Sequence, residues 1–203
     1  MPPQFRLHGA FGHQLREQKF RRDIRRHHFG ADLLGVDADG VVRAVADLGG
    51  VFIARGTQVS DIHTILSHEA PGVTSRQNYR GLAADEARGV FHGQIKVESE
   101  ARGADATQNN RNMLLSKRAQ VHSTPALVIL TDDVKCKHGS ATGQIDPAQL
   151  FYLRSRGLDL AEATRILTRA FAGEILSRLQ GGGTRDLVES QIAPSLEALG
   201  VAA

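Results

Sequence analysis

The residues best suited to chemistry lie close together within residues 132–139. If this segment is extended, Cys136 and His138 lie on one face, because side chains two residues apart in a strand point to the same side. A thiolate and an imidazole placed in this way can bind one soft or borderline metal ion. Lys135 and Lys137 flank the thiol, and we expect their positive charge to lower its pKa.

Two ligands do not complete a metal site, so a metal ion or cluster at Cys136 and His138 needs ligands from another chain. A cysteine after a valine is also typical of a small core residue, so a packed thiol remains an alternative. Cys136 is the only cysteine, which excludes an intrachain disulfide. Asp132 and Asp133 are weaker candidates for acid and base catalysis, because adjacent strand residues point to opposite faces.

The sequence lacks the common signatures of nucleotide-binding and hydrolytic enzymes. It contains no Gly-Lys dipeptide, which excludes a Walker A loop, and neither a His-Glu-x-x-His nor a G-x-S-x-G motif. Its net charge is only +3, and residues 16–28 alone contribute +4. This local basic stretch could meet phosphate, but a solvated face with arginine stems lying on apolar neighbours explains it better. We therefore expect no nucleic-acid partner.

We expect a soluble, cytoplasmic protein that does not enter a membrane. The first residues show no apolar region behind a basic one, as a signal peptide would require. The longest aliphatic run, residues 126–130, is far shorter than the roughly 20 residues that span a bilayer. A free cysteine is consistent with a reducing compartment.

The elements that position these residues are predicted to be short strands. Apolar and polar residues alternate over residues 91–98, which is typical of a half-buried strand. Similar pieces recur, for example at residues 113–115 and 128–130, with no helical stretch between them. A sandwich, a barrel or a β-solenoid would all explain this pattern. Hairpin turns are not evident after residue 91, which favours a parallel β-helix, while the first third of the chain is left unassigned.

Near Gly143 the pattern changes to helix. Asp146 and Pro147 are typical of a helix start, and Gly157 of a helix end, with Leu150, Phe151 and Leu153 expected to face inward. Further helices are predicted after Asp159 and after Thr184, with Pro194 kinking or ending the last one. The expected organisation is a β-helix core over residues 1–144 and a small C-terminal helical domain over residues 145–203.

Several segments in this order resemble the SufD family of the SUF iron–sulfur cluster assembly system, within the SufB/SufD superfamily. They are Thr74-Ser75-Arg76-Gln77, Tyr79-Arg80-Gly81, Ala87-Arg88-Gly89-Val90-Phe91-His92-Gly93, Gln108-Asn109-Asn110-Arg111-Asn112-Met113-Leu114-Leu115-Ser116, residues 132–139 and Leu150-Phe151-Tyr152-Leu153-Arg154-Ser155-Arg156-Gly157. The resemblance covers residues 57–179. Here Thr142 lies one place later than the threonine of the family's His-Gly-Ala-Thr-x-Gly pattern, and family members are typically longer.

The resemblance implies a mainly β protein, a right-handed parallel β-helix followed by C-terminal helices. It implies a non-catalytic subunit that pairs edge to edge with SufB and offers its C-terminal helices to the ATPase SufC. A family histidine at the SufB interface corresponds to His138, and Cys136 is the cysteine of the same motif. Any metal ion or nascent iron–sulfur cluster would then be completed by ligands of the partner, with no cofactor tightly bound by this chain alone.

The same resemblance implies that SufC contacts the C-terminal helices, where the expected contact residues are Leu150, Phe151, Tyr152, Arg154 and Arg156. Without its partners the chain could form a homodimer. The alternative function is a β-solenoid enzyme acting on a polysaccharide, with Asp132 or Asp133 as the acid. Few aromatic side chains for sugar stacking weigh against this alternative, since only 5% of the residues are aromatic.

Overall fold

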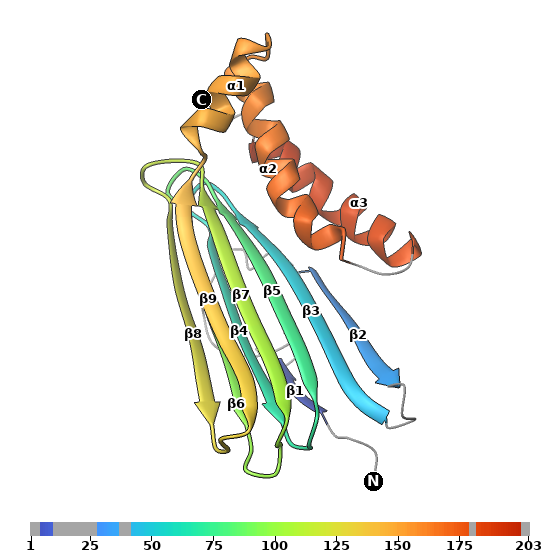
Figure 1. Cartoon of the computed structure of the whole chain (residues 1–203). Helices are drawn as coiled ribbons and strands as arrows, with labels where there is room; N and C mark the ends of the chain where they lie inside the picture. Colours follow the sequence, from blue (N-terminus) through green and yellow to red (C-terminus); the bar gives the residue numbers. More distant parts are fainter. Residues whose placement is uncertain (1–4, 10–27, 37–41, 179–181, 200–203) are drawn as a thin grey trace, which may run out of the picture.

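Strands come first and helices last in the part of the chain that the structure describes (Figure 1). In the computed structural model this part comprises residues 5–9, 28–36, 42–178 and 182–199. The strands are β1 (Phe5–Gly9), β2 (His28–Val36), β3 (Val42–Ala54), β4 (Val59–His68), β5 (Thr74–Ala83), β6 (Arg88–Val97), β7 (Ala104–Leu114), β8 (Gln120–Ile129) and β9 (Val134–Gln144). The helices are α1 (Pro147–Ser155), α2 (Leu160–Leu176) and α3 (Gly182–Leu199).

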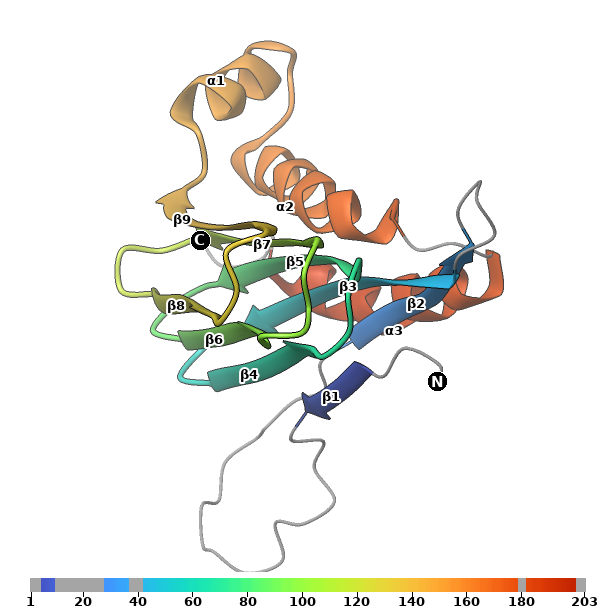
Figure 2. The same cartoon turned by 60° about the horizontal axis from the view of Figure 1, so that its bottom comes forward.

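The strands from β3 to β9 wind as a solenoid. One sheet contains, in order, the neighbouring strands β3, β5, β7 and β9. A second sheet contains β4, β6 and β8 in the same way. All of these neighbours pair in parallel. Consecutive strands belong to different sheets, so each two strands complete one coil around a shared interior (Figure 2). A sandwich or barrel of hairpins would instead pair consecutive strands. The predicted parallel β-solenoid is therefore confirmed.

Two antiparallel strands precede the coils. β1 pairs with β4, and β2 pairs with β3. The sequence reasoning missed both strands, although Asp39-Gly40, between β2 and β3, is a dipeptide typical of hairpin connections. Within the basic stretch at residues 16–28, all but His28 lies outside the described residues.

The interior is packed by the residues whose alternation predicted a strand. Phe91, Ile95 and Val97 of β6 are fully buried, as expected. Phe91 packs against Tyr79 of β5, with ring centroids 4.8 Å apart. Gly81 of β5 admits the ring of Phe52, because a side chain at Gly81 would occupy the same space. The contact between Phe91 and Tyr79 joins the two sheets, and that between Phe52 and Gly81 joins neighbouring strands of one sheet.

Polar side chains also lie in the interior, toward the end where β8 and β9 are found. The buried members are Gln77, Gln108, Asn110 and Asn112. In-register parallel strands stack equivalent positions one above another, and Gln108 Nε2 donates a hydrogen bond to Gln77 Oε1 at 3.2 Å. A polar row therefore runs between coils beneath β9.

The two first helices begin at their predicted caps. The side chain of Asp146 accepts a hydrogen bond from the backbone N–H of Ala148, and that of Asp159 accepts one from Glu162 N–H. These contacts satisfy N–H groups that have no partner within the helix. Gly157, with φ of 96°, lies just after α1, where a left-handed conformation favours glycine. Among the described helices, none is long and apolar enough to cross a membrane.

Helix α2 lies against the sheet of β3 and β5 (Figure 1). Its buried Ala172, Ile175 and Leu176 pack with Val51 and Leu82 of that sheet. Both α2 and α3 cover the sheet, and α1 projects beyond it. The covering helices close one side of the solenoid.

One helix prediction is wrong. Phe151 was expected to face inward, but its side chain is 74% exposed and α1 contains no buried residue. Leu150 and Leu153 of the same pattern are half-buried, so only part of the predicted apolar face is covered by the described residues. Pro194 was predicted to kink or end the last helix. It does not end it, because α3 continues through it to Leu199.

Candidate functional site

Strands β8 and β9 form the open end of the solenoid. β8 pairs with β6 and β9 pairs with β7, and no described strand pairs with their other edges. Backbone N–H and C=O groups along such edges are free to pair with a strand of another chain. Three apolar residues near this edge are also exposed, namely Val128, Ile129 and Leu130. The end of the solenoid is therefore suited to association.

Cys136 and His138 lie on the interior face of β9, as their spacing predicted. Cys136 is in register with Ala106, and His138 with Gln108, both of which are buried in the coil below. No described coil covers β9, so His138 is exposed even though it belongs to the interior face. An imidazole in this position can contact a molecule that docks on the open end.

Cys136 is half-buried and packs against the small cluster that includes Ile95 and Val97. Burial raises the pKa of its thiol, and the negative charge of Asp105 acts in the same direction, while a backbone hydrogen bond at Ala106 opposes them. The predicted lowering by flanking lysines is therefore wrong. Those lysines alternate to the opposite face of β9, away from the thiol.

The polar row continues from the buried coils to the interior face of β9. Gln108 Oε1 is buried and has no hydrogen-bond partner among the described residues, one strand below His138. Further along, Asn112 Nδ2 donates to Thr142 Oγ1 at 3.2 Å and to Asn110 Oδ1 at 2.6 Å. Thr142, which is displaced relative to the family pattern, thus contacts the row. The open end presents polar groups around the imidazole as well as an apolar edge.

The described residues do not gather into a complete metal site. Across the described ranges, no group of three or more His, Cys, Asp or Glu side chains could hold a metal ion. Asp132 and Asp133 are exposed in the turn before β9, outside the interior face. His138 and Cys136 are thus two potential donors that another chain would have to complete.

Residues 19–171 match the family model described as "SUF system FeS cluster assembly, SufBD core domain". The chain belongs to the SufBD family. It is 39% identical over 139 residues to the iron–sulfur cluster assembly protein SufD of Escherichia coli K12, covering 68% of this chain and 33% of that protein. It is 32% identical over 142 residues to SufD of Bacillus subtilis 168, covering 70% of this chain and 32% of that protein. The chain therefore spans about a third of the length of these two curated relatives.

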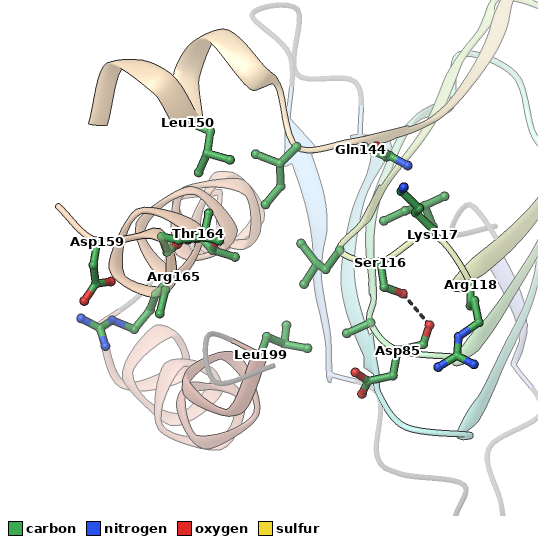
Figure 3. A pocket seen from close by; sticks show the side chains of 16 residues that line it. Asp85, Ser116, Lys117, Arg118, Gln144, Leu150, Asp159, Thr164, Arg165 and Leu199 are labelled. Carbon is green, nitrogen blue, oxygen red and sulfur yellow. Dashed lines mark hydrogen bonds between the residues drawn. The ribbon is translucent and has the colours of Figure 1, made fainter. Parts of the chain in front are cut away.

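A second feature of this SufBD-family chain is a cavity of about 990 Å³ between the turns of the solenoid and the C-terminal helices (Figure 3). Leu115 lines it from the solenoid, Leu150 from α1 and Leu199 from α3. The charged residues of the lining are Asp85, Lys117, Arg118, Asp159 and Arg165. The cavity combines an apolar wall with charges of both signs.

Helix α1 presents most of the residues that were expected to contact a partner. Tyr152 is 57% exposed, and Arg154 and Arg156 are exposed as well. The guanidinium of Arg156 lies over the Tyr152 ring, 5.3 Å from its centroid. Leu150 differs from the others because it is half-buried and lines the cavity. Phe151, Tyr152, Arg154 and Arg156 thus form an exposed surface on and just after α1.

Sequence reasoning did not single out Gln108 or the cavity. Gln108 belongs to a segment that carries the family resemblance. Gln108, Asn110 and Asn112 are spaced two residues apart, which was a usable signal for polar groups on one strand face. The cavity had no signal of this kind, because its walls come from turns and helices far apart in the sequence.

Proposed function

We propose that this chain is a SufD-like, non-catalytic scaffold subunit of a SUF complex, in which it supports iron–sulfur cluster assembly between itself and SufB. The observation that carries the proposal is the open end of the solenoid, where β9 presents His138 at an edge with which no described strand pairs. Family membership and the names of the curated relatives support the process, which is iron–sulfur cluster assembly.

The open edge supports pairing with SufB. An exposed strand edge is a template for a strand of another chain, and main-chain hydrogen bonds supply affinity in such pairing. The exposed Ile129 and Leu130 beside this edge would lose contact with water in the interface. Without SufB, the same edge is available to a second copy of the chain, so we also propose a homodimer in isolation.

His138 is the proposed ligand of this chain toward iron or a nascent cluster, which is the cargo of the complex. Imidazole suits iron, and SufB would supply the remaining donors. Cys136 is the second proposed donor. Its raised pKa means that a metal ion would have to displace the thiol proton, which makes binding at this residue pH-dependent.

Helix α1 and the neighbouring cavity support docking of SufC. Exposed Phe151 and Tyr152 are the kind of aromatic anchors that dominate protein interfaces, and Arg154 and Arg156 add charge around them. Leu150 connects this surface to the cavity wall. ATP-driven movement of SufC would then reach the solenoid through the helices.

Copurification tests the proposal. The tagged chain is expressed with SufB and SufC from one organism, and we expect both to be recovered with it. Ile129→Glu, at the open end, should abolish recovery of SufB, because it buries a charge in the interface. Val59→Glu is the control, since Val59 is also an exposed apolar residue but lies on β4, away from that end. Recovery of neither partner by the unmodified chain would refute the proposal.

A further inference from the structure

Two histidines lie side by side on the outer face of the sheet formed by β4, β6 and β8. β4 and β6 pair in parallel with His63 opposite His92, and their ring centroids are 5.4 Å apart. Both belong to the face that alternates with the buried residues of these strands, so the rings point away from the solenoid interior. This face is separate from the interior face of β9 that presents His138 (Figure 2).

The spacing of the two rings suits a shared metal ion. Two imidazoles bound to one tetrahedral ion through bonds of about 2.0 Å have ring centroids roughly 5 Å apart. The rings are tilted by 35° rather than stacked flat, so rotation about the side-chain bonds can bring one nitrogen of each ring together. The strands that carry them are hydrogen-bonded neighbours over ten residue pairs, which fixes the separation of their backbones.

Asp61 adds a feature typical of metal-binding histidines. Its Oδ1 lies 2.9 Å from Nε2 of His63, two residues further along the same face of β4. A carboxylate only accepts hydrogen bonds, so Nε2 carries a proton, and in the neutral imidazole Nδ1 then keeps its lone pair. Carboxylates that hold the far nitrogen of a ligating histidine orient the ring and raise its basicity. Asp61 thereby prepares His63 to bind a metal through Nδ1.

A third histidine lies on the same face. His122 of β8 is in register with Val90, which precedes His92 by two residues on β6. It is exposed and lies diagonally from His92, in the next strand of the sheet. Long or aromatic side chains at such diagonal positions can reach one another. The histidines thus extend across three neighbouring strands.

We propose that His63 and His92 form a binding site for a divalent first-row transition metal ion on the outer face of the solenoid. Asp61 is a positioning residue for His63, and His122 lies on the same face in the next strand of the sheet. Within the described residues no three potential ligands are already gathered, so water completes the coordination. Two protein ligands make the site labile and exchangeable. This site is independent of the proposed SUF scaffold role and of the donors on β9.

Separate titrations of the full chain with Co²⁺, Ni²⁺, Cu²⁺ and Zn²⁺ test the proposal. Isothermal titration calorimetry at neutral pH, in a buffer that does not bind metals, is expected to detect one site per chain, with Ni²⁺ and Cu²⁺ bound more tightly than Co²⁺. His63→Ala and His92→Ala should each weaken binding at least about tenfold, and Asp61→Asn should weaken it by a similar factor through the lost orientation. Both histidines are surface residues, so circular dichroism should show unchanged folding.

His138→Ala and Cys136→Ser are the matched controls. We expect the affinity measured for the outer face to be unchanged in both variants. Paramagnetic broadening by Ni²⁺ should fall on NMR signals of β4 and β6 rather than on those of β9. Equal binding by His63→Ala, His92→Ala and the unmodified chain would overturn the proposal. So would loss of binding in the β9 variants alone, or the absence of binding to the unmodified chain.

Discussion

Glu174 of α2 neutralises an arginine that is buried beneath the helix. Arg80 of β5 is only 2% exposed, and its Nη2 lies 2.7 Å from Oε1 of Glu174. The same guanidinium lies 5.6 Å from the ring centroid of Phe171 and donates a hydrogen bond to the carbonyl of Tyr79 at 3.2 Å. Glu174→Ala would leave this cation buried with those two weaker contacts. We expect the variant to be strongly destabilised.

The size of the effect follows from the unequal exposure of the two partners. Removing one partner of a buried ion pair costs about 3–5 kcal/mol. Glu174 is 55% exposed, so water already solvates part of the pair and can enter when the side chain is removed. We therefore expect a loss below that range, about 2–3 kcal/mol of the free energy of unfolding. Urea unfolding followed by circular dichroism measures this quantity directly.

A neighbouring ion pair provides the control. Arg178 of the turn after α2 lies 2.9 Å from Asp47 of β3, and both side chains are partly exposed. Arg178→Ala should cost less than about 1 kcal/mol, as is usual for exposed pairs. Arg80→Met in the Glu174→Ala background should recover most of the loss, because it removes the unpaired charge. Equal losses for Glu174→Ala and Arg178→Ala would refute the reasoning.

Two further predictions concern the interior. Burial lowers the pKa of His68 from 6.5 to about 4, so the unfolded chain binds a proton that the folded chain does not. Stability should fall by up to about 3 kcal/mol as the pH decreases from 6.5 toward 4, and His68→Asn should flatten this dependence in urea titrations at several pH values. Gly81→Ala should cost about 1–3 kcal/mol, because the added methyl would clash with the ring of Phe52. Gly139→Ala is its control, since nothing lies within 4 Å of a methyl at that position, and equal unfolding midpoints for the two variants would contradict the packing described.

The solenoid could be predicted because its local pattern is strong. Alternation over residues 91–98, with no helices between strands, was enough to favour parallel coils, and the structure confirms them. Which strands pair could not be predicted, because register depends on packing between residues far apart in the chain. The antiparallel strand β1 was missed for a related reason, since its partner is the distant β4. β2 pairs with the next strand, β3, and was missed although Asp39-Gly40 between them is typical of a hairpin.

The candidate site was predicted in part. The spacing of Cys136 and His138 placed them on one face, because that property follows from strand geometry alone. The direction of the thiol pKa was wrong, because burial depends on the coil beneath and could not be read from the neighbouring lysines. Exposure of Phe151 was likewise missed, since an apolar residue shows that a surface needs a partner without showing whether the chain supplies it.

The pairing of His63 with His92 had no signal in the linear sequence. The two residues meet because β4 and β6 are neighbours in one parallel register. Arg80 and Glu174 meet for a similar reason, through the docking of α2 on β5. Such contacts between distant segments are the part of this molecule that only its three-dimensional structure reveals.

The central claim is that this chain contributes His138 to cluster assembly at its interface with SufB. The most direct measurement is the iron and sulfide content of the complex purified after coexpression with SufB and SufC, for the unmodified chain and for His138→Ala. We predict that both chains fold and recover their partners, and that the His138→Ala complex carries much less cluster. An unchanged cluster content in the His138→Ala complex would contradict the account.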